Sequence, residues 1–358
     1  MPAGGVLTSL QKTDLSACDN SASFLQSGFW GSFKSRFGWE ALAFRAVWDN
    51  GAAKPLLVLR RSLTAGLPGI PGFSLAYIPW GPELPNDTYR AAVNDLAASL
   101  KEQLPADTVF IRFDPPWYTA GSAAPPPVLE APFIRSGADI QAPDTVLLDL
   151  TRSMESLTGQ MKPKWRYNAR LALKKGVVIR RAGAGETDVF YKLLKETARR
   201  DGIAIHGIEY YRTLLENNWY NGLKPDTRLY LAEHEGDVLA GIVTLFCGRE
   251  AVYLYGASSD RKRSLMAPYA LQLKAMEDAM AFHCEEYDLF GIPPDDDPDH
   301  PMAGLYRFKT GFGGRIIHRP GSWDYPCRPL VYRLFRSAET MRKTLRTMKK
   351  NRKKIHQN

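Results

Sequence analysis

TRLYLAEHEGDVLAGIVTLFCGREAVYLYGASS, residues 227–259, contains three runs of apolar, β-branched and aromatic residues in close succession. Such residues favour strands over helices. Gly236 and Gly248 lie between the runs, and short connections that contain glycine are typical of hairpins. The stretch therefore predicts three consecutive antiparallel strands.

The segments on either side complete a known order of elements. The apolar spacing predicts helices at 154–176, 186–202 and 209–219, a strand at 177–182, a helix at 266–284 and a strand at 287–292. Helices, antiparallel strands, a helix and another strand are typical of the GNAT-type acyltransferase fold. Residues 23–116 follow a similar order, which predicts a second, related domain beside the first.

The charge of the chain is concentrated at one end. The formal net charge is +9 over 358 residues. Ten of the 47 Lys and Arg residues, but only one of the 38 acidic residues, lie from Arg333 onwards, so residues 1–332 are neutral overall. A concentrated basic segment favours polyanions, either nucleic acid or an anionic membrane surface. A solubilising tail without a partner is the alternative.

Two motifs could carry chemistry. KPKWRYNARLALKKGV, residues 162–177, places six cations around Trp165 and Tyr167. This pattern suits phosphate contacts beside aromatic packing, or a solvated helix whose aromatic residues dock on the domain. GLYRFKTGFGG, residues 304–314, surrounds Lys309 with glycines, which lets backbone approach a ligand closely. Lys309 could stabilise the oxyanion formed when an amine attacks an ester, or could be idle in an exposed turn.

Asp114, in RFDPP, is expected at the end of a strand, where binding residues gather in α/β folds. It could accept a proton or fix the bend at Pro115-Pro116. The acidic run at 295–300 is expected to be solvated, and we predict no metal site.

The loop that grips coenzyme A in GNAT enzymes has no counterpart here. That loop presents glycine-rich backbone amides to the pyrophosphate at the start of a helix. At this point the chain has SDRKRSLMAPYALQ, residues 259–272, with Met266 and Pro268 where glycines belong. Because proline has no amide proton, a coenzyme A donor is disfavoured.

In this order and spacing, KPKWRYNARLALKKGV, YLYGASS and GLYRFKTGFGG resemble the FemABX family, whose members use aminoacyl-tRNA to build interpeptide bridges on peptidoglycan precursors. FLQSGFWGSFKSRFGW (24–39) and YIPWGP (77–82) extend the resemblance to nearly the whole chain. It implies an α+β fold of two GNAT-like domains, each a mixed, mostly antiparallel sheet flanked by helices. The implied parts are an acceptor-binding domain at 1–147 completed by 317–335, a domain on the aminoacyl-tRNA side at 148–316, and a basic C-terminal helix or tail at 336–358.

The resemblance also implies roles for individual residues. Lys309 matches a lysine that stabilises the tetrahedral intermediate, and Asp114 matches an acceptor-site aspartate that could act as general base. The expected substrate-binding residues are Lys34, Trp30, Tyr255, Tyr253, His206 and Tyr211. The expected tRNA contacts are Phe308, Lys164, Arg166, Lys174 and Lys175. Many relatives place an arginine where this chain has His206, and a histidine is only partly charged at neutral pH, so weaker phosphate binding is expected there.

The resulting expectation is an aminoacyltransferase that moves an amino acid from aminoacyl-tRNA to the stem-peptide amine of lipid II or UDP-MurNAc-pentapeptide, with no cofactor besides the charged tRNA. We expect a cytoplasmic location, because the first residues lack the pattern of a secretory signal, and we also expect a monomer. The anionic inner face of the membrane is a further candidate partner. Two alternatives stay open: a GNAT-like N-acyltransferase with another activated donor, and a non-catalytic RNA- or membrane-binding protein that acts through the tail.

Overall fold

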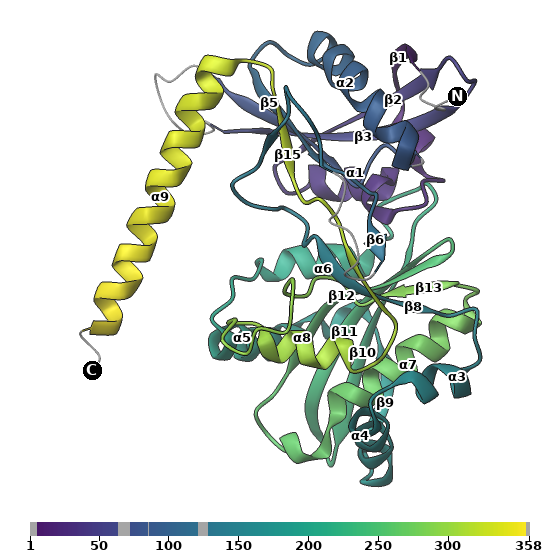
Figure 1. The fold of residues 1–358 in the computed structure, drawn as a ribbon. Coiled ribbons are helices and arrows are strands. Elements are labelled where there is room, and N and C mark those ends of the chain that lie inside the picture. The colour runs from purple at the N-terminus through teal and green to yellow at the C-terminus, as the bar shows by residue number, and fades with distance from the viewer. Residues whose placement is uncertain (1–5, 64–71, 85, 121–127, 356–358) are drawn as a thin grey trace.

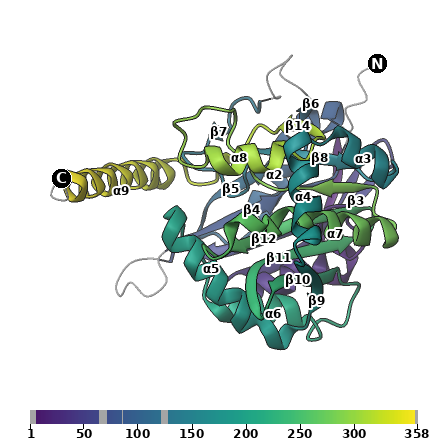
Figure 2. The same ribbon diagram turned by 90° about the horizontal axis from the view of Figure 1, so that it is seen from below.

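The computed structural model describes residues 6–63, 72–84, 86–120 and 128–355, which form two domains built on sheets and a projecting C-terminal helix (Figure 1). Within these residues, the first sheet has seven strands in the order β1-β2-β3-β4-β5-β15-β7. The second sheet has eight, in the order β6-β14-β8-β13-β12-β11-β10-β9. Helices flank both sheets (Figures 1 and 2), so the architecture is α+β, as predicted.

The second domain confirms the three strands predicted at 227–259. They are β10 (Asp226–His234), β11 (Asp237–Cys247) and β12 (Glu250–Ser258), and consecutive strands pair antiparallel. The central strand β11 is almost wholly buried, because side chains pack on both faces of the sheet. The other elements of this domain are β6 (Thr119–Ala120), β8 (Asp144–Asp149), α3 (Met154–Gln160), α4 (Pro163–Lys174), β9 (Val178–Ala182), α5 (Thr187–Asp201), α6 (Ile208–Glu216), α7 (Ala267–Ala281), β13 (Glu286–Asp288), α8 (Ala303–Thr310) and β14 (Arg315–His318).

The first domain repeats this layout. Its elements are β1 (Leu7–Thr13), α1 (Gly28–Ser35), β2 (Glu40–Trp48), β3 (Ala53–Ser62), β4 (Ser74–Pro79), α2 (Asn86–Gln103), β5 (Thr108–Asp114) and β7 (Ile134–Arg135). In each domain, helices follow the first of four antiparallel strands, and a further helix (α2 or α7) leads to a strand parallel to the fourth. The repeated order confirms two GNAT-like domains.

Near its end the chain returns to the first domain. β14 extends the second sheet beside β8, whereas β15 (Trp323–Pro326) pairs with β5 in the first sheet. Arg112 of β5 and Asp324 of β15 form a buried bidentate ion pair, with Nε–Oδ1 at 2.7 Å and Nη2–Oδ2 at 2.9 Å. The hydroxyl of Tyr332, in α9 (Pro329–Ile355), donates to the same carboxylate at 2.9 Å. This network holds both β15 and the start of α9 on the first sheet.

The sheets divide the chain at slightly different points from the predicted domain bounds. The boundary predicted between 147 and 148 falls inside β8, which belongs to the second sheet. The C-terminal helix begins at Pro329 rather than at 336. The roles assigned to the two domains stay predictions.

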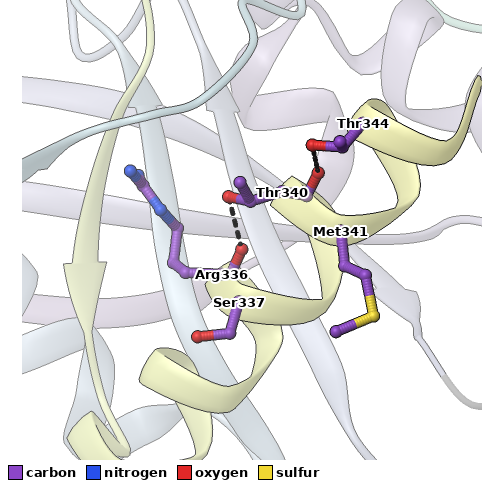
Figure 3. Close-up of a pocket in the computed structure, with 5 residues that line it drawn as sticks. All are labelled: Arg336, Ser337, Thr340, Met341 and Thr344. Carbon is purple, nitrogen blue, oxygen red and sulfur yellow. Dashed lines mark hydrogen bonds between the residues drawn. The ribbon is translucent and has the colours of Figure 1, made fainter. Parts of the chain in front are cut away.

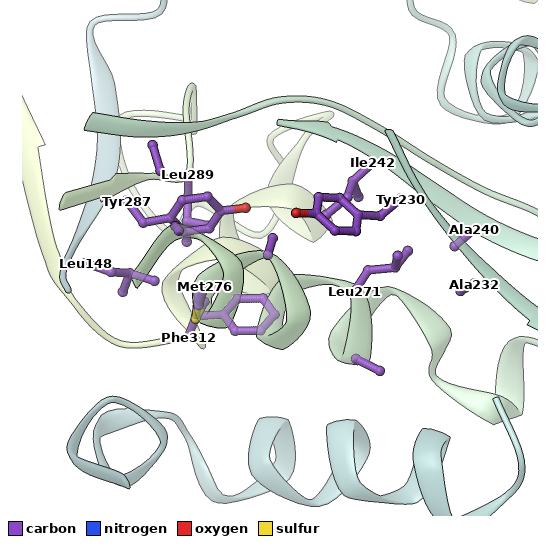
Figure 4. Packing of buried hydrophobic residues seen from close by; sticks show 14 of the residues in the cluster. Leu148, Tyr230, Ala232, Ala240, Ile242, Leu271, Met276, Tyr287, Leu289 and Phe312 are labelled. Carbon is purple, nitrogen blue, oxygen red and sulfur yellow. The ribbon is translucent and has the colours of Figure 1, made fainter. Parts of the chain in front are cut away.

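Alternate residues of the second sheet face two different apolar clusters. Tyr230 and Ala232 pack with Leu271 and Met276 of α7 (Figure 4). Neighbouring residues of the same strand join a second cluster, which also contains residues of α5, α6 and α1. This alternation follows from the two-residue period of a strand.

The second cluster crosses from one domain to the other. Phe29 of α1 stacks on Trp219, with ring centroids 5.2 Å apart. Asp19 of the first domain accepts hydrogen bonds from the Tyr220 hydroxyl and, at 3.0 Å, from the Leu223 amide. The two domains therefore share one core.

Three local predictions were wrong. The segment 304–314, expected as a glycine-rich loop, forms α8 over most of its length: Gly304 lies in the first turn, and the other three glycines follow the end of the helix. The helix expected to run from residue 23 to a turn at Gly38 is a short 3-10 turn (Phe24–Gln26) followed by α1, because Ser27 ends the first and caps the second. The edge strand β1 was not predicted, because its short stretch mixes polar and apolar residues.

Candidate active site

The two motifs expected to contact RNA and substrate pack against each other. Trp165 of α4 donates its indole N–H to the Phe308 carbonyl of α8 at 2.8 Å. Gly311, which follows α8, lies against the same indole, and a Cβ atom there would come within 2.1 Å of it. The glycine is therefore needed for the contact between α4 and α8, rather than for backbone contact with a ligand. Phe308 lies half-buried, edge-on to Tyr269 with ring centroids 5.3 Å apart.

Lys309 is a buried cation. Its side chain is enclosed (6% exposed), and Nζ donates to the carbonyl oxygens of Phe290 at 3.0 Å and Gly291 at 2.9 Å. Nζ also lies 5.2 Å from the ring centroid of Tyr253. An ammonium has three donors, so one remains for a further acceptor. Burial lowers the pKa of Lys309 to about 7, and the charge of Asp288 opposes this shift. The alternative of an exposed lysine is wrong, because the side chain is buried.

The turn that directs these carbonyls is held by Asp288, at the end of β13. Its Oδ1 accepts the Phe290 N–H at 2.7 Å and the Thr145 hydroxyl at 2.5 Å. Phe290 has φ +59°, a costly conformation for a residue with a side chain. The bond from Asp288 offsets this cost and fixes residues 290–291 over Lys309. Asp288 was not predicted from the sequence, because its role depends on a turn that no local pattern indicates.

A pocket of about 520 Å³ opens beside Gly291. It is lined by residues of the loops 139–144 and 291–294, together with His300 and Met302. Gly291 therefore connects the pocket to the ammonium of Lys309. The acidic run next to the pocket shapes its own loop, since Asp295 accepts the Asp297 amide at 3.2 Å and Asp297 accepts the Asp299 amide at 2.9 Å. Within the described ranges, no group of three or more His, Cys, Asp or Glu is arranged to hold a metal ion.

Asp114 joins three segments of the chain. It is 3% exposed, and its oxygens accept from Tyr77 of β4 at 2.5 Å, from the amide of Gln141 at 3.3 Å and from the hydroxyl of Ser322. Burial raises the pKa of Asp114 to about 6, although the hydrogen bonds from Ser322 and Tyr77 oppose the shift. Asp114 thus holds the loop that forms one wall of the pocket. The alternative prediction for Asp114 was that it fixes the local bend at Pro115-Pro116. That role would not account for these long-range contacts.

A bulge in β12 places the side chains of Tyr253 and Tyr255 on different faces of the sheet. Val243 of β11 pairs with Tyr255, and the next residue, Thr244, pairs with Tyr253, so Leu254 is an extra residue in the ladder. Without the bulge, residues two apart would share a face. Instead, Tyr253 packs with the cluster around α7 and lies near Lys309, whereas Tyr255 packs in the cluster shared by the two domains. The two tyrosines, both predicted to bind substrate, therefore lie in different clusters.

The predicted substrate-binding residues other than Tyr253 gather at the domain junction. Lys34 of α1 is surrounded by rings, with Nζ at 5.6 Å from the centroid of Trp30, 5.8 Å from Trp39 and 5.4 Å from Tyr210. Tyr211 packs edge-on against Tyr255 at 5.1 Å. Helices α1 and α6 and strand β12 thus bring these residues together from both domains.

Arg61 is a further cation at this place that sequence analysis missed. Its guanidinium lies 5.4 Å from the centroid of Trp39, the ring that Lys34 also contacts. Burial, and then the charge of Arg61, lower the pKa of Lys34 to about 8. Among the described residues, neither cation forms an ion pair with a carboxylate. Two cations held together without a counter-ion indicate a site for an anion. The sequence hardly indicates this role for Arg61, because two arginines are adjacent at the end of β3. Only the structure shows that Arg60 forms ion pairs with carboxylates and that Arg61 forms none within the described part of the chain.

His206 is placed beside Lys34 but is poorly suited to bind an anion by charge. Its ring stacks on Tyr210 with centroids 3.9 Å apart. Desolvation and the charge of Lys34 lower the pKa of His206. His206 therefore carries a positive charge less readily than a free imidazole, and weaker phosphate binding at this residue stays a prediction.

The cations of α4 differ in their availability. Arg166 donates to the carbonyl oxygens of Gly159 and Met161, both at 2.7 Å, at the end of α3. Its guanidinium therefore caps the C-terminal end of α3. This structural role was not predicted for Arg166, which was expected to bind tRNA. Lys164, Lys174 and Lys175 are exposed on the surface of α4.

The start of α7 shows why a coenzyme A loop is absent. Met266 precedes the helix with φ +57°, and Pro268 lies in its first turn. The amides of Leu265 and Met266 donate to the carbonyls of Lys262 and Arg263, at 2.9 and 3.1 Å. These amides are used within the turn, so they cannot form the anion-binding loop of a coenzyme A enzyme.

Comparisons with known proteins show the family of the chain. The FemAB family model matches residues 131–222 and 226–340. The lipid II:glycine glycyltransferase of Staphylococcus epidermidis (strain RP62A) is 24% identical over 87% of this chain and 89% of the relative. The enzyme of the same name from Staphylococcus aureus (strain USA300) is also 24% identical, with the same coverage. These relatives are transferases, which supports a transferase activity for this chain.

The fold is also that of a solved structure. The crystal structure of FemX matches with a TM-score of 0.74 and 21% identity, over 92% of this chain and 100% of FemX. Since the family model covers more than half of the sequence, the chain belongs to the FemAB family.

Proposed function

We propose that this protein is an aminoacyltransferase that moves an amino acid from aminoacyl-tRNA to the stem-peptide amine of a peptidoglycan precursor. The observation that carries the proposal is the buried ammonium of Lys309. Two of its three N–H donors bind carbonyl oxygens, one of which belongs to Gly291 at the edge of the pocket, and the third donor is left for a substrate. Family membership and the two glycyltransferase relatives support the class of reaction. The reaction needs no cofactor beyond the charged tRNA.

The reaction requires stabilisation of a developing negative charge rather than a strong acid or base. The stem-peptide amine attacks the carbonyl carbon of the aminoacyl ester, and the carbonyl oxygen becomes an oxyanion. The free N–H of Lys309 stabilises that oxyanion. The intermediate then collapses to an amide, the ribose hydroxyl of the tRNA leaves as an alkoxide, and the proton lost by the amine reaches this leaving oxygen. Lys309 acts by its charge and position, and Asp114 acts by holding the pocket wall at Gln141.

The anion site around Lys34 and Arg61 suits the phosphate groups of the precursor. Both candidate precursors carry a diphosphate next to the sugar that bears the stem peptide. The rings of Trp30, Trp39 and Tyr210 desolvate Lys34 and thereby strengthen its attraction for phosphate. The exposed lysines at 164, 174 and 175 are available to the tRNA backbone.

Arg61→Gln is expected to raise KM for the precursor about tenfold or more, because a charge-assisted hydrogen bond contributes roughly 1.5–3 kcal/mol. We expect kcat to change little, since Arg61 is proposed to bind the precursor phosphate and not to contact the reacting carbonyl. Steady-state kinetics with a nucleotide-linked precursor would measure both constants. Arg45→Gln, an exposed arginine on β2 of the same sheet, is the matched control. An unchanged KM would remove Arg61 from the site.

The rate is expected to pass through a maximum between about pH 6 and pH 7. Below about pH 6, Asp114 becomes protonated and loses acceptor capacity for its three donors. Above about pH 7, Lys309 loses the proton that stabilises the oxyanion. A profile of kcat/KM from pH 5 to 9 should show both limbs, with the acid limb lost in Asp114→Asn. A profile that stays flat through pH 8 would contradict the role of the Lys309 charge.

The direct test is transfer of radiolabelled amino acids from a pool of charged tRNA to lipid-linked and nucleotide-linked muropeptide. Label in either precursor would establish the reaction and identify the acceptor. No transfer to either acceptor from any charged tRNA would overturn the proposal and favour an N-acyltransferase with another activated donor. Binding of coenzyme A, measured by calorimetry, is the accompanying check for that alternative.

A further inference from the structure

Among the described residues, the contacts that attach the C-terminal helix α9 to the body come from its first turns. Tyr332 is buried against Phe110 of β5, with ring centroids 5.3 Å apart, and Arg336 donates to the carbonyl of Arg135 at 2.7 Å. Beyond Arg336, the hydroxyls of Thr340 and Thr344 donate to carbonyls of the helix itself (Figure 3). The rest of α9 projects away from both domains in two perpendicular views (Figures 1 and 2).

This helix carries an exposed apolar stripe. Leu330, Leu334 and Met341 are 76%, 72% and 65% exposed, which makes them the three most exposed large apolar side chains among the described residues. Their spacing of four and seven residues places them on one face of a helix. The stripe is therefore not part of the core that anchors α9, to which Val331 and Phe335 belong.

The same helix holds the excess positive charge of the chain. From Arg333 onwards the sequence has ten Lys or Arg residues and a single acidic residue, Glu339. No helix of the described residues is long and apolar enough to cross a membrane. A basic helix with an apolar face is the kind of helix that lies in the interface of a bilayer, with the apolar face among the acyl chains and the cations at the lipid phosphates.

We propose that α9 docks the protein on an anionic lipid surface through the stripe Leu330, Leu334 and Met341. The stripe favours lipid over RNA as the partner, because phosphate contacts need only the cations and leave three large apolar side chains in water. The helix projects from the first domain, so its exposed apolar face is free to contact a surface. The inference concerns binding alone and stands independently of the proposed reaction.

The test uses the full chain with sedimenting vesicles of phosphatidylglycerol and phosphatidylcholine, or of phosphatidylcholine alone. We expect the anionic vesicles to bind at least about tenfold more tightly, because each cation near such a surface contributes about a fivefold gain. The double variant Leu334→Ser/Met341→Ser should lower the partition coefficient about tenfold or more, since two apolar side chains no longer enter the bilayer. Raising the salt concentration should weaken binding of both proteins.

Leu223→Ser is the matched control, because Leu223 is also largely exposed (60%) but lies far from α9 in the sequence. It should bind vesicles like the unmodified protein, and all variants should keep transfer to a soluble acceptor. Vesicle binding that the double variant retains would overturn the proposal, as would equal binding to neutral vesicles. Loss of tRNA binding, with vesicle binding kept, would identify α9 as an RNA surface instead.

Discussion

Lys309→Met is expected to lower kcat by about 10²–10³-fold, the loss typical of removing one donor from an oxyanion site. Methionine keeps much of the length and the apolar stem of lysine but has neither charge nor N–H. The carbonyl oxygens of Phe290 and Gly291 then lose their donor, which is expected to cost about 1–3 kcal/mol of stability. Transfer assays with saturating charged tRNA and precursor measure the rate, and denaturant unfolding measures the stability separately.

Arg307→Met provides the matched control for this prediction. Arg307 lies two residues before Lys309 on the same helix, but its side chain is exposed. Its loss should leave kcat nearly unchanged. If Lys309→Met folds normally and transfers amino acids at the unmodified rate, Lys309 serves only to hold the turn at 290–291, and the oxyanion must be stabilised elsewhere.

Asp324→Ala is expected to destabilise the protein by about 3–5 kcal/mol, because it leaves the guanidinium of Arg112 buried without a counter-charge. Asp324 is fully enclosed (0% exposed), and it accepts from Arg112 through both oxygens and from Tyr332. Urea unfolding followed by tryptophan fluorescence would measure the change. We also expect release of α9, since Tyr332 loses its partner, and this would appear as faster proteolysis after Arg328.

Glu285→Ala is the control for a surface ion pair. Glu285 pairs with Arg249 on the surface, and exposed pairs of this kind contribute about 0–1 kcal/mol. A loss as small for Asp324→Ala would show that Arg112 reaches water when its partner is removed. In that case the return strand β15 would be held mainly by its backbone bonds to β5.

The order of elements in both domains could be predicted from the sequence, because it depends on local patterns. The runs in 227–259 gave the central strands of the second sheet, since β-branched and aromatic residues are separated by glycines at the turns. The helix α8 was missed because Gly304 and Gly311 suggested a loop. Gly304 lies in its first turn, and Gly311 follows its end, where the absence of a side chain admits Trp165.

The site could be predicted only in part. Lys309 and Lys34 were found through family motifs, but the reasons for their properties lie far away in the sequence. The bulge at Leu254 separates Tyr253 from Tyr255, and it follows from the register of two paired strands rather than from any residue in them. Asp288 and Arg61 act through a turn and through a shared tryptophan, which are tertiary features.

The return of β15 to the first sheet constrains how the protein is made on the ribosome. Strand β5 is synthesised early, yet its neighbour β15 appears only after almost all of the second domain has been translated. Until then β5 has an open edge, and open edges invite pairing with other chains. Domains usually fold in order as they emerge, but here neither sheet can close before residues 315–326 leave the ribosome. A premature stop codon anywhere upstream therefore yields no finished domain, and we expect such nascent fragments to depend on chaperones rather than to accumulate as stable N-terminal halves.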